Sequence, residues 1–125
     1  MQLRIGAKEL PGVIELDLGG RLVAGEECDA VRAKIKDLLA SGQANIFLNM
    51  AEVTRIDSTG IGMMVEAAIN IARQGGHLKL VKLPRLIYNV LHTHRLVQAF
   101  EVHNSEEDAL ASLQTAQSNP APAPP

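Results

Sequence analysis

The sequence predicts a single α/β domain on a mixed β-sheet, mostly parallel with an antiparallel N-terminal edge, packed with about four helices. Three observations predict it. The spacing of apolar residues alternates along the chain between a period of 2 and a period of about 3.6. Glycine and proline lie where one period changes to the other, and 46% of the 125 residues are apolar. A chain of this length buries roughly two-thirds of its unfolded surface as one domain. We expect that domain over residues 1–116.

The first predicted element is a β-hairpin. The segments "QLRIGA" and "VIELDL" alternate apolar and polar residues on either side of "KELPG", which suits a turn. Apolar residues then recur at helical spacing from Cys28 to Leu39, and Gly42 ends this helix. The apolar run "NIFLNM" predicts a central strand, and "AEVTR" a short loop after it.

Helices and strands alternate in the second half of the chain. Helical spacing returns from Ile61 and ends at Gly75, "HLKLVKL" alternates as a strand, and Pro84 begins a third helix. The segment "LVQAFEV" predicts a last strand, and Ser105 a capped fourth helix. Strands joined by helices run parallel through right-handed crossovers, so the opening hairpin supplies the antiparallel edge. The Pro- and Ala-rich residues 117–125 lack apolar area and are expected to form a disordered tail.

Composition excludes several function classes. The formal charge of -2 supplies no basic field for nucleic acid or for an anionic membrane. Cys28 is the single cysteine, so neither an internal disulfide nor a four-cysteine zinc site can form. The chain starts with no leader pattern and lacks the roughly 20 consecutive apolar residues of a membrane span. We therefore expect a soluble protein in the cytoplasm, with no direct contact to nucleic acid or membrane.

The segment "IDSTGIG" carries the candidate chemistry. A serine hydrolase needs a glycine two residues before its nucleophile, and Ile56 stands there. The glycines that follow fit neither a dinucleotide-binding loop nor a Walker motif, so no cofactor is predicted. Phosphorylation of Asp57 would need a magnesium site of further carboxylates. Two interpretations of Ser58 remain, a helix N-cap or a residue that a partner phosphorylates, because helix N-termini accept phosphate well. In the second, Gly60 and Gly62 leave the amides uncovered and let another backbone approach.

The histidines do not predict a metal site. His92 and His94 are two residues apart and point to different sides of a helix, and no cysteine or carboxylate cluster accompanies them or His103. His92 and His94, together with Arg85 and Arg95, are instead expected to form a solvated surface at the end of a helix. No metal ligand and no catalytic residue is predicted. The adjacent Met63 and Met64 are expected in the core or, as an alternative, at a partner interface.

Much of the chain resembles the STAS domain family. The resemblance runs from about residue 10 to residue 113 and includes "LGGRLVAGEECDAVRAKIKDLL" and "LVQAFEVHNSEEDAL". Its most specific part is "LNMAEVTRIDSTGIGMMV", similar to the family's strand, loop, Asp-Ser-[Ser/Thr]-Gly-[Leu/Ile]-Gly signature and helix. Stand-alone bacterial anti-sigma factor antagonists are the members that it resembles in particular. The resemblance implies a STAS-like fold.

The resemblance also implies partner switching. In those antagonists an anti-sigma factor that is also a serine kinase phosphorylates the serine after the aspartate, and a PP2C-type phosphatase removes the phosphate. Only the unphosphorylated antagonist holds the anti-sigma factor and thereby regulates transcription indirectly. Carried over, Ser58 is the phosphorylation site and Asp57, Thr59, Gly60 and Gly62 shape it.

The partner surface implied by the resemblance has one departure. Asn49 matches the family's polar residue near the end of the central strand. The departure lies after the second strand. Many antagonists carry Gly-Glu-[Leu/Ile]-Asp there, where this chain reads "GRLV", so Arg21 and Val23 replace two acids. This predicts either a partner with complementary acidic residues or a divergent pathway. A homodimer through a sheet edge stays open.

Two functions are therefore carried forward. The first is the phosphorylation-switched antagonist, and an enzyme is not expected because no base, metal or phosphate loop accompanies Ser58. The alternative is an adaptor STAS domain of a larger signalling assembly or a lipid-transport machine, in which Ser58 is only a helix cap.

Overall fold

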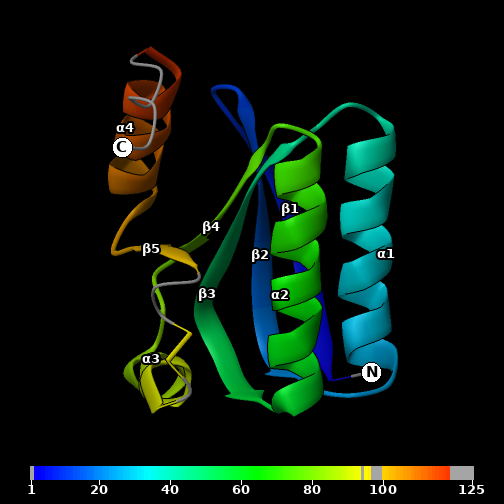
Figure 1. Ribbon diagram of the computed structural model, residues 1–125. Helices are drawn as coiled ribbons and strands as arrows, with labels where there is room; N and C mark the ends of the chain where they lie inside the picture. Colours follow the sequence, from blue (N-terminus) through cyan, green and yellow to red (C-terminus); the bar gives the residue numbers. More distant parts are fainter. Residues whose placement is uncertain (1, 94, 97–99, 119–125) are drawn as a thin grey trace.

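The order of the elements along the chain is the predicted one. The computed structural model describes residues 2–93, 95–96 and 100–118. Figure 1 shows the elements in these residues as one sheet with helices on both sides. They are β1 (Leu3–Leu10), β2 (Val13–Leu22), α1 (Glu26–Ala40), β3 (Asn45–Ile56), α2 (Ser58–Arg73), β4 (His77–Val81), α3 (Arg85–Thr93), β5 (Glu101–His103) and α4 (Glu106–Ser118).

The sheet confirms the predicted mixed topology. Its five strands lie in chain order, β1-β2-β3-β4-β5. The β1–β2 pair is antiparallel, and each of the three later pairs is parallel. A parallel pair cannot be closed by a tight turn, so α1, α2 and α3 serve as its crossover connections. The carboxyl ends of β2 and β3 therefore lie together, where the loops into α1 and α2 begin.

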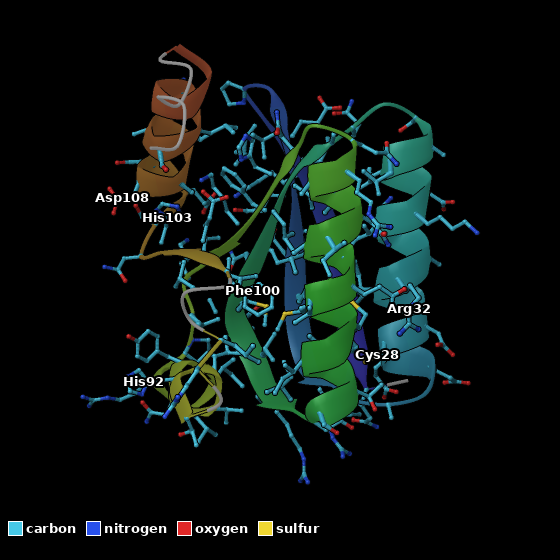
Figure 2. All side chains as sticks on the ribbon, in the orientation of Figure 1. Cys28, Arg32, His92, Phe100, His103 and Asp108 are labelled. Carbon is cyan, nitrogen blue, oxygen red and sulfur yellow. The ribbon has the colours of Figure 1, made fainter. Side chains whose placement is uncertain are left out.

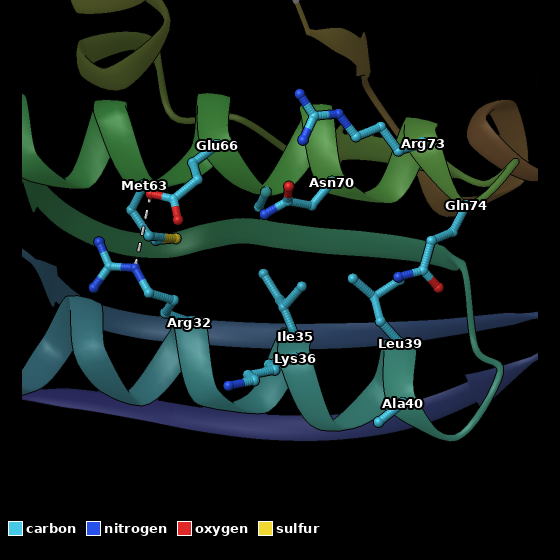
Figure 3. Close-up of a pocket in the computed structure, with 11 residues that line it drawn as sticks. Arg32, Ile35, Lys36, Leu39, Ala40, Met63, Glu66, Asn70, Arg73 and Gln74 are labelled. Carbon is cyan, nitrogen blue, oxygen red and sulfur yellow. Dashed lines mark ion pairs between the residues drawn. The ribbon is translucent and has the colours of Figure 1, made fainter.

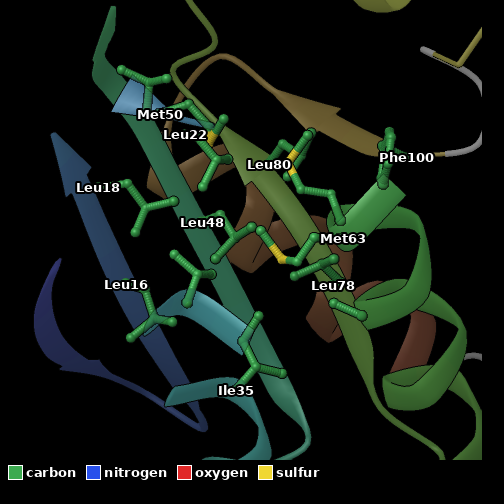
Figure 4. Packing of buried hydrophobic residues seen from close by; sticks show 14 of the residues in the cluster. Leu16, Leu18, Leu22, Ile35, Leu48, Met50, Met63, Leu78, Leu80 and Phe100 are labelled. Atoms are coloured by element: carbon green, nitrogen blue, oxygen red, sulfur yellow. The ribbon is translucent and has the colours of Figure 1, made fainter. Parts of the chain in front are cut away.

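The main core lies between the sheet and the α1–α2 layer. Alternate residues of the central strands, such as Leu16, Leu48 and Leu80, point toward these helices (Figure 4). Met63 and Met64 are buried in this core, which confirms the first of the two expectations for them. Gly42 and Gly75 follow α1 and α2 at positive φ, the left-handed position that commonly ends a helix.

The opposite face of the sheet is partly covered by α4, which Figure 1 shows on the far side from α1 and α2. A second, smaller apolar cluster forms there. The Ser105 hydroxyl accepts a hydrogen bond from Asp108 N–H at 3.0 Å, which confirms the predicted helix start. The cluster consists of Val13, Phe47, Val81, Ala109 and Leu113.

Several predicted boundaries are wrong. The expected loop "AEVTR" is strand, because β3 continues to Ile56 by pairing with β2 up to Leu22. Gly19 and Gly20 do not break β2 but lie where its register with β3 shifts, a β-bulge that sequence patterns do not distinguish from a turn. The expected strand "LVQAFEV" is β5, which begins at Glu101; residues 97–99 lie outside the described residues.

The C-terminal helix is also longer than expected. It continues to Ser118 and so includes the first two residues of the predicted tail. The remainder of the predicted tail, residues 119–125, lies outside the described residues.

Candidate functional site at the start of α2

Asp57, and not Ser58, caps the N-terminus of α2. Its backbone is extended, and its Oδ1 accepts a hydrogen bond from Gly60 N–H at 2.9 Å. Its Oδ2 accepts a second bond, also 2.9 Å long, from Ala24 N–H in the loop before α1. These two bonds hold the pKa of Asp57 below its usual range, because both favour the charged form. One ionised carboxylate thus joins the loops that follow β2 and β3.

Ser58 is the first residue of α2, and its side chain is exposed. Within the described part of the chain, its hydroxyl makes no hydrogen bond. The interpretation of Ser58 as the helix cap is therefore wrong, because the preceding carboxylate already occupies that position. Thr59, the next residue, is exposed as well. The start of α2 presents two hydroxyl groups to solvent, and neither is used by the cap.

The two glycines of the motif differ in their surroundings. Gly60 is buried, and a side chain there would overlap the carbonyl oxygen of Leu22 and lie 2.9 Å from the Cγ1 atom of Ile56. Gly62 is exposed, and a side chain there would have no neighbour within 4 Å. Gly60 is thus required by close packing of α2 on the end of β2, whereas Gly62 leaves open space on the helix surface.

Two arginines lie side by side at this end of the sheet. Arg21 of β2 and Arg55 of β3 are register partners, one position before Leu22 and Ile56. Both are exposed, and neither forms an ion pair with a described residue. Arg21 stands where many family members carry Glu, and it therefore adds a second positive charge beside Arg55. We call these two residues the basic pair. Sequence analysis missed Arg55 because it assigned this residue to a loop. The position of Arg55 beside Arg21 depends on a strand register that shifts twice between β2 and β3, and no local pattern indicates such shifts.

Val23 and Asn49 are placed differently from Arg21. Val23 is half-buried, and its carbonyl accepts a hydrogen bond from Cys28 N–H at 3.2 Å. Asn49 lies in the middle of β3, not near its end, and its Oδ1 accepts from Ala51 N–H at 3.0 Å. Ile56 lies seven positions after Asn49 along the extended strand, about 23 Å away. The structure thus does not bring Asn49 to Ser58, and its part in a partner surface stays a prediction.

Neither the cysteine nor the histidines form a reactive group in the described residues. Cys28 lies on the buried face of α1, and burial raises the pKa of its thiol, so it stays protonated and unreactive (Figure 2). Figure 2 shows His92 on α3 and His103 near α4, well apart from each other. His94 lies outside the described residues. No metal-binding group of three His, Cys, Asp or Glu side chains occurs among the described residues.

A row of five residues, four of them charged, crosses the sheet beneath α4, and sequence analysis did not identify it. In register, the row reads Lys8, Glu15, Phe47, Lys79 and Glu101. Glu15 and Lys79 are buried, and the Lys79 Nζ lies 2.9 Å from Glu101 Oε1. Burial raises the pKa of Glu15 to about 7, helped by the neighbouring Asp17 carboxyl and opposed by Lys8. This row thus brings four titratable groups together among the described residues.

None of the helices in the described part of the chain combines the length and the apolar content that a bilayer-spanning helix needs. A search of curated protein sequences finds no match.

Similar folds occur in several solved structures. A candidate anti-sigma factor antagonist from Thermotoga maritima superposes with a TM-score of 0.79 at 23% identity, over 88% of this chain and 94% of that one. The Bacillus cell-fate determinant SpoIIAA in its phosphorylated form gives 0.69 at 19% identity, over 88% and 99%. A sulfate transporter family protein from Wolinella succinogenes gives 0.71 at 22% identity, over 90% and 93%. These likenesses show the fold.

Sequence comparison provides the family. The STAS domain model matches residues 4–109, which include most of β1, the Asp57–Ser58 turn and the start of α4. The match covers most of the chain and agrees with the observed sheet order and helix placement. This chain therefore belongs to the STAS domain family.

Proposed function

We propose that this chain is an anti-sigma factor antagonist that acts by binding and has no catalysis of its own. In its unphosphorylated form it binds an anti-sigma factor that also has serine kinase activity. Phosphorylation of Ser58 ends this binding, and a PP2C-type phosphatase restores it. Transcription is regulated indirectly, through the sigma factor that the anti-sigma factor releases, and no cofactor is needed.

One observation carries the proposal: the Ser58 hydroxyl is exposed and unused at the N-terminus of α2 because Asp57 supplies the cap. A phosphoacceptor hydroxyl must be accessible to the kinase, and a capping hydroxyl would have to leave its backbone partner first. In the reaction, the Ser58 oxygen bonds to the γ-phosphorus of ATP, ADP leaves, and the hydroxyl proton passes to a base of the kinase. SpoIIAA, a structural neighbour, has been solved both unphosphorylated and phosphorylated.

The effect of the phosphate follows from its surroundings. The dipole at the start of α2, with the first-turn N–H groups that Asp57 does not already bond, stabilises a phosphate on Ser58. The ionised Asp57 carboxylate is adjacent, so about -1.5 to -2 further charges accumulate at one edge of the domain. Binding can therefore switch through surface charge while the fold stays unchanged.

The partner surface is proposed to be acidic where it meets β2 and β3. Arg21 and Arg55 are exposed register partners without an ion pair among the described residues, at the end of the sheet that leads to Ser58. A partner carboxylate between them would gain two charge-assisted contacts. A phosphate on Ser58 would instead repel that partner. Asp57, Thr59, Gly60, Gly62 and Val23 belong to the proposed surface, and Asn49 is included from the family resemblance alone.

Phosphorylation is tested by incubating the chain with ATP and each anti-sigma factor kinase of its own genome. We expect one phosphate on the wild-type chain and on Thr59→Ala, and none on Ser58→Ala. Label that persists in Ser58→Ala, or no label with any such kinase, contradicts the switch.

Partner exchange is tested by a pulldown that compares Ser58→Ala with Ser58→Asp. We expect Ser58→Ala to hold the anti-sigma factor and Ser58→Asp to release it. Equal recovery of the same partners by both variants would favour the adaptor function, in which Ser58 has no regulatory part.

The altered "GRLV" segment, at the end of β2 and the start of the loop after it, is tested with Val23→Asp, which restores one acid of the usual family pattern. If this loop determines the partner, Val23→Asp changes either the affinity for the kinase or the rate of phosphorylation. An unchanged affinity and rate would show that the loop does not select the partner.

A further inference from the structure

A groove of about 550 Å³ lies between α1 and α2, away from the Ser58 turn. Figure 3 shows Ile35 and Leu39 of α1 pointing toward α2, with Met63 and Asn70 of α2 pointing back. Its volume falls within the range of small-molecule sites. The lining combines an apolar floor with polar groups at the rim, the usual pattern of such sites.

The floor of the groove is fixed by the fold. Ile35, Met63 and Ala67 line it only with the 4%, 1% and 7% of their surface that stays exposed, and Leu39, which packs partly against the same core, offers more. Because these side chains are held by packing against the sheet, the apolar surface exists before any ligand arrives. An alkyl chain placed there would leave water for a preformed apolar wall.

The rim is basic, although the whole chain carries a net charge of -2. It contains the cations Arg32, Lys36 and Arg73 against one carboxylate, Glu66. Arg32 is the only one of the three with an ion pair among the described residues: Asp29 at 3.1 Å, and Glu66 at the limiting distance of 4.0 Å. The three cations outnumber these two carboxylates, so the rim carries a small excess of positive charge, with Lys36 and Arg73 free of an ion pair among the described residues.

The two helices also indicate where a bound negative charge would lie. Both follow parallel strands, so their C-terminal ends, which are the negative ends of the helix dipoles, lie together near Ala40 and Gln74 (Figure 1). An anionic group is disfavoured at that end. Arg32 and Lys36 lie nearer the N-terminal half of the groove, and Figure 3 shows Arg73 pointing away from α1. The anion thus belongs beside Arg32 and Lys36, with the apolar part along Leu39.

We propose that the groove between α1 and α2 binds a small amphipathic anion: one alkyl or acyl chain with a carboxylate or phosphate head group. Arg32 and Lys36 hold the head group, and the floor of Ile35, Met63, Leu39 and Ala67 holds the chain. This site is separate from Ser58 and does not depend on phosphorylation.

The test is calorimetric titration of the full chain with decanoate and with decyl phosphate, below their micelle concentrations. Decyltrimethylammonium is the control for charge, and butyrate is the control for chain length. We expect both decyl anions to bind and both controls to bind at least about tenfold more weakly. Tighter binding of one decyl anion identifies the head group. Equal binding of the decyl cation, or no binding of either decyl anion, overturns the proposal.

Variants locate the site. Lys36→Gln is expected to weaken decanoate binding about threefold to tenfold. Lys34→Gln, on the same helix but outside the groove, is expected to leave it unchanged, as is Ser58→Asp. Backbone amide shifts on titration are expected in residues 32–40 and 63–74. Shifts confined to other residues, equal losses in both lysine variants, or much tighter binding of an acidic amphipathic peptide than of decanoate would overturn the site or its occupant.

Discussion

Asp57 accepts a hydrogen bond from Ala24 N–H at 2.9 Å, and so the residue before the candidate phosphorylation site holds the loop that precedes α1. The same carboxylate caps α2 through Gly60 N–H. The two loops at the end of the parallel strands are thus coupled by one side chain. A partner that contacts the start of α2 meets the "GRLV" segment in a defined position.

Removal of the Asp57 carboxylate is expected to destabilise the fold. Asp57→Ala loses both backbone bonds and should lower the free energy of unfolding by about 1–2 kcal/mol. Asp57→Asn keeps one acceptor oxygen and should lose less. Urea denaturation at pH 7 measures both, with the exposed Asp37→Asn as control. An Asp57→Ala variant as stable as the wild type would show that the bridge contributes nothing.

The pH dependence of this bridge has a definite sign. The folded-state pKa of Asp57 is lowered, so its stabilisation is present above the unfolded pKa of about 3.9 and is lost as the pH falls through the lower folded value. Acid unfolding should therefore be less steep in Asp57→Asn than in the wild type below about pH 4. Identical acid transitions in the two proteins would contradict this.

The motif glycines form a matched pair. Gly60→Ala places a methyl group against the Leu22 carbonyl and is expected to cost about 1–3 kcal/mol. Gly62→Ala enters open space in a helix and should stabilise by about 0.5–1 kcal/mol. Thermal unfolding of the two variants gives opposite shifts if this is correct. Equal destabilisation by both would mean that α2 does not sit as closely on β2 as described.

Glu15 is expected to make stability fall as the pH rises toward neutrality. Its folded pKa of about 7 exceeds its ordinary 4.5, so the folded state holds a proton that the unfolded state releases between these values. The groups that face it are Lys8 on β1, Asp17 on its own strand and Glu106 on α4. Glu15→Gln should flatten this dependence and stabilise the protein above pH 7 by up to about 3 kcal/mol.

The measurement is the free energy of unfolding between pH 5 and pH 8. Glu9→Gln, an exposed carboxylate on the neighbouring strand, is the control and should keep the wild-type dependence. A parallel pH profile for wild type and Glu15→Gln would show that Glu15 titrates normally.

The buried lysine and its partner should respond unequally. Lys79 is buried and bonds Glu101 at 2.9 Å and Ser112 at 3.3 Å, whereas Glu101 is half exposed. Glu101→Ala leaves a buried cation with one neutral partner, at an expected cost of about 1–3 kcal/mol. Lys79→Met replaces the cation with an apolar chain of similar length and should cost less. Denaturant unfolding ranks the two; the reverse order would contradict the role given to burial.

The basic pair is expected to control partner affinity. Arg21→Glu and Arg55→Glu should each weaken anti-sigma factor binding about tenfold or more at low salt, and the loss should shrink as salt rises. Arg73→Glu, on α2 but distant from Ser58, is the matched control and should bind as the wild type does. Affinity titrations at two salt concentrations test this, and tighter binding by either strand variant would show that the partner surface is not acidic.

Local patterns were sufficient for much of the fold. Each helix and each hairpin strand buries one face. Its apolar residues therefore recur with a period of about 3.6 in α1 and α2 and of 2 in the opening hairpin, and both periods can be recognised in the sequence. The strand end at Ile56 did not follow, because "AEVTR" is polar and forms a strand only by pairing with β2. The Ser58 cap was also misassigned, since Asp and Ser are equally good N-caps and only the backbone conformation distinguishes adjacent candidates.

By itself, the sequence determined the order of strands and helices, the core faces and the position of Ser58 at the start of a helix. Those properties are local or periodic, and each residue's neighbours in the chain encode them. The tertiary structure alone decided that Asp57 bonds Ala24, that Arg21 lies beside Arg55, and that Glu15 and Lys79 are buried in one row. Strand register and helix docking bring these distant residues together, and both depend on packing of the whole chain.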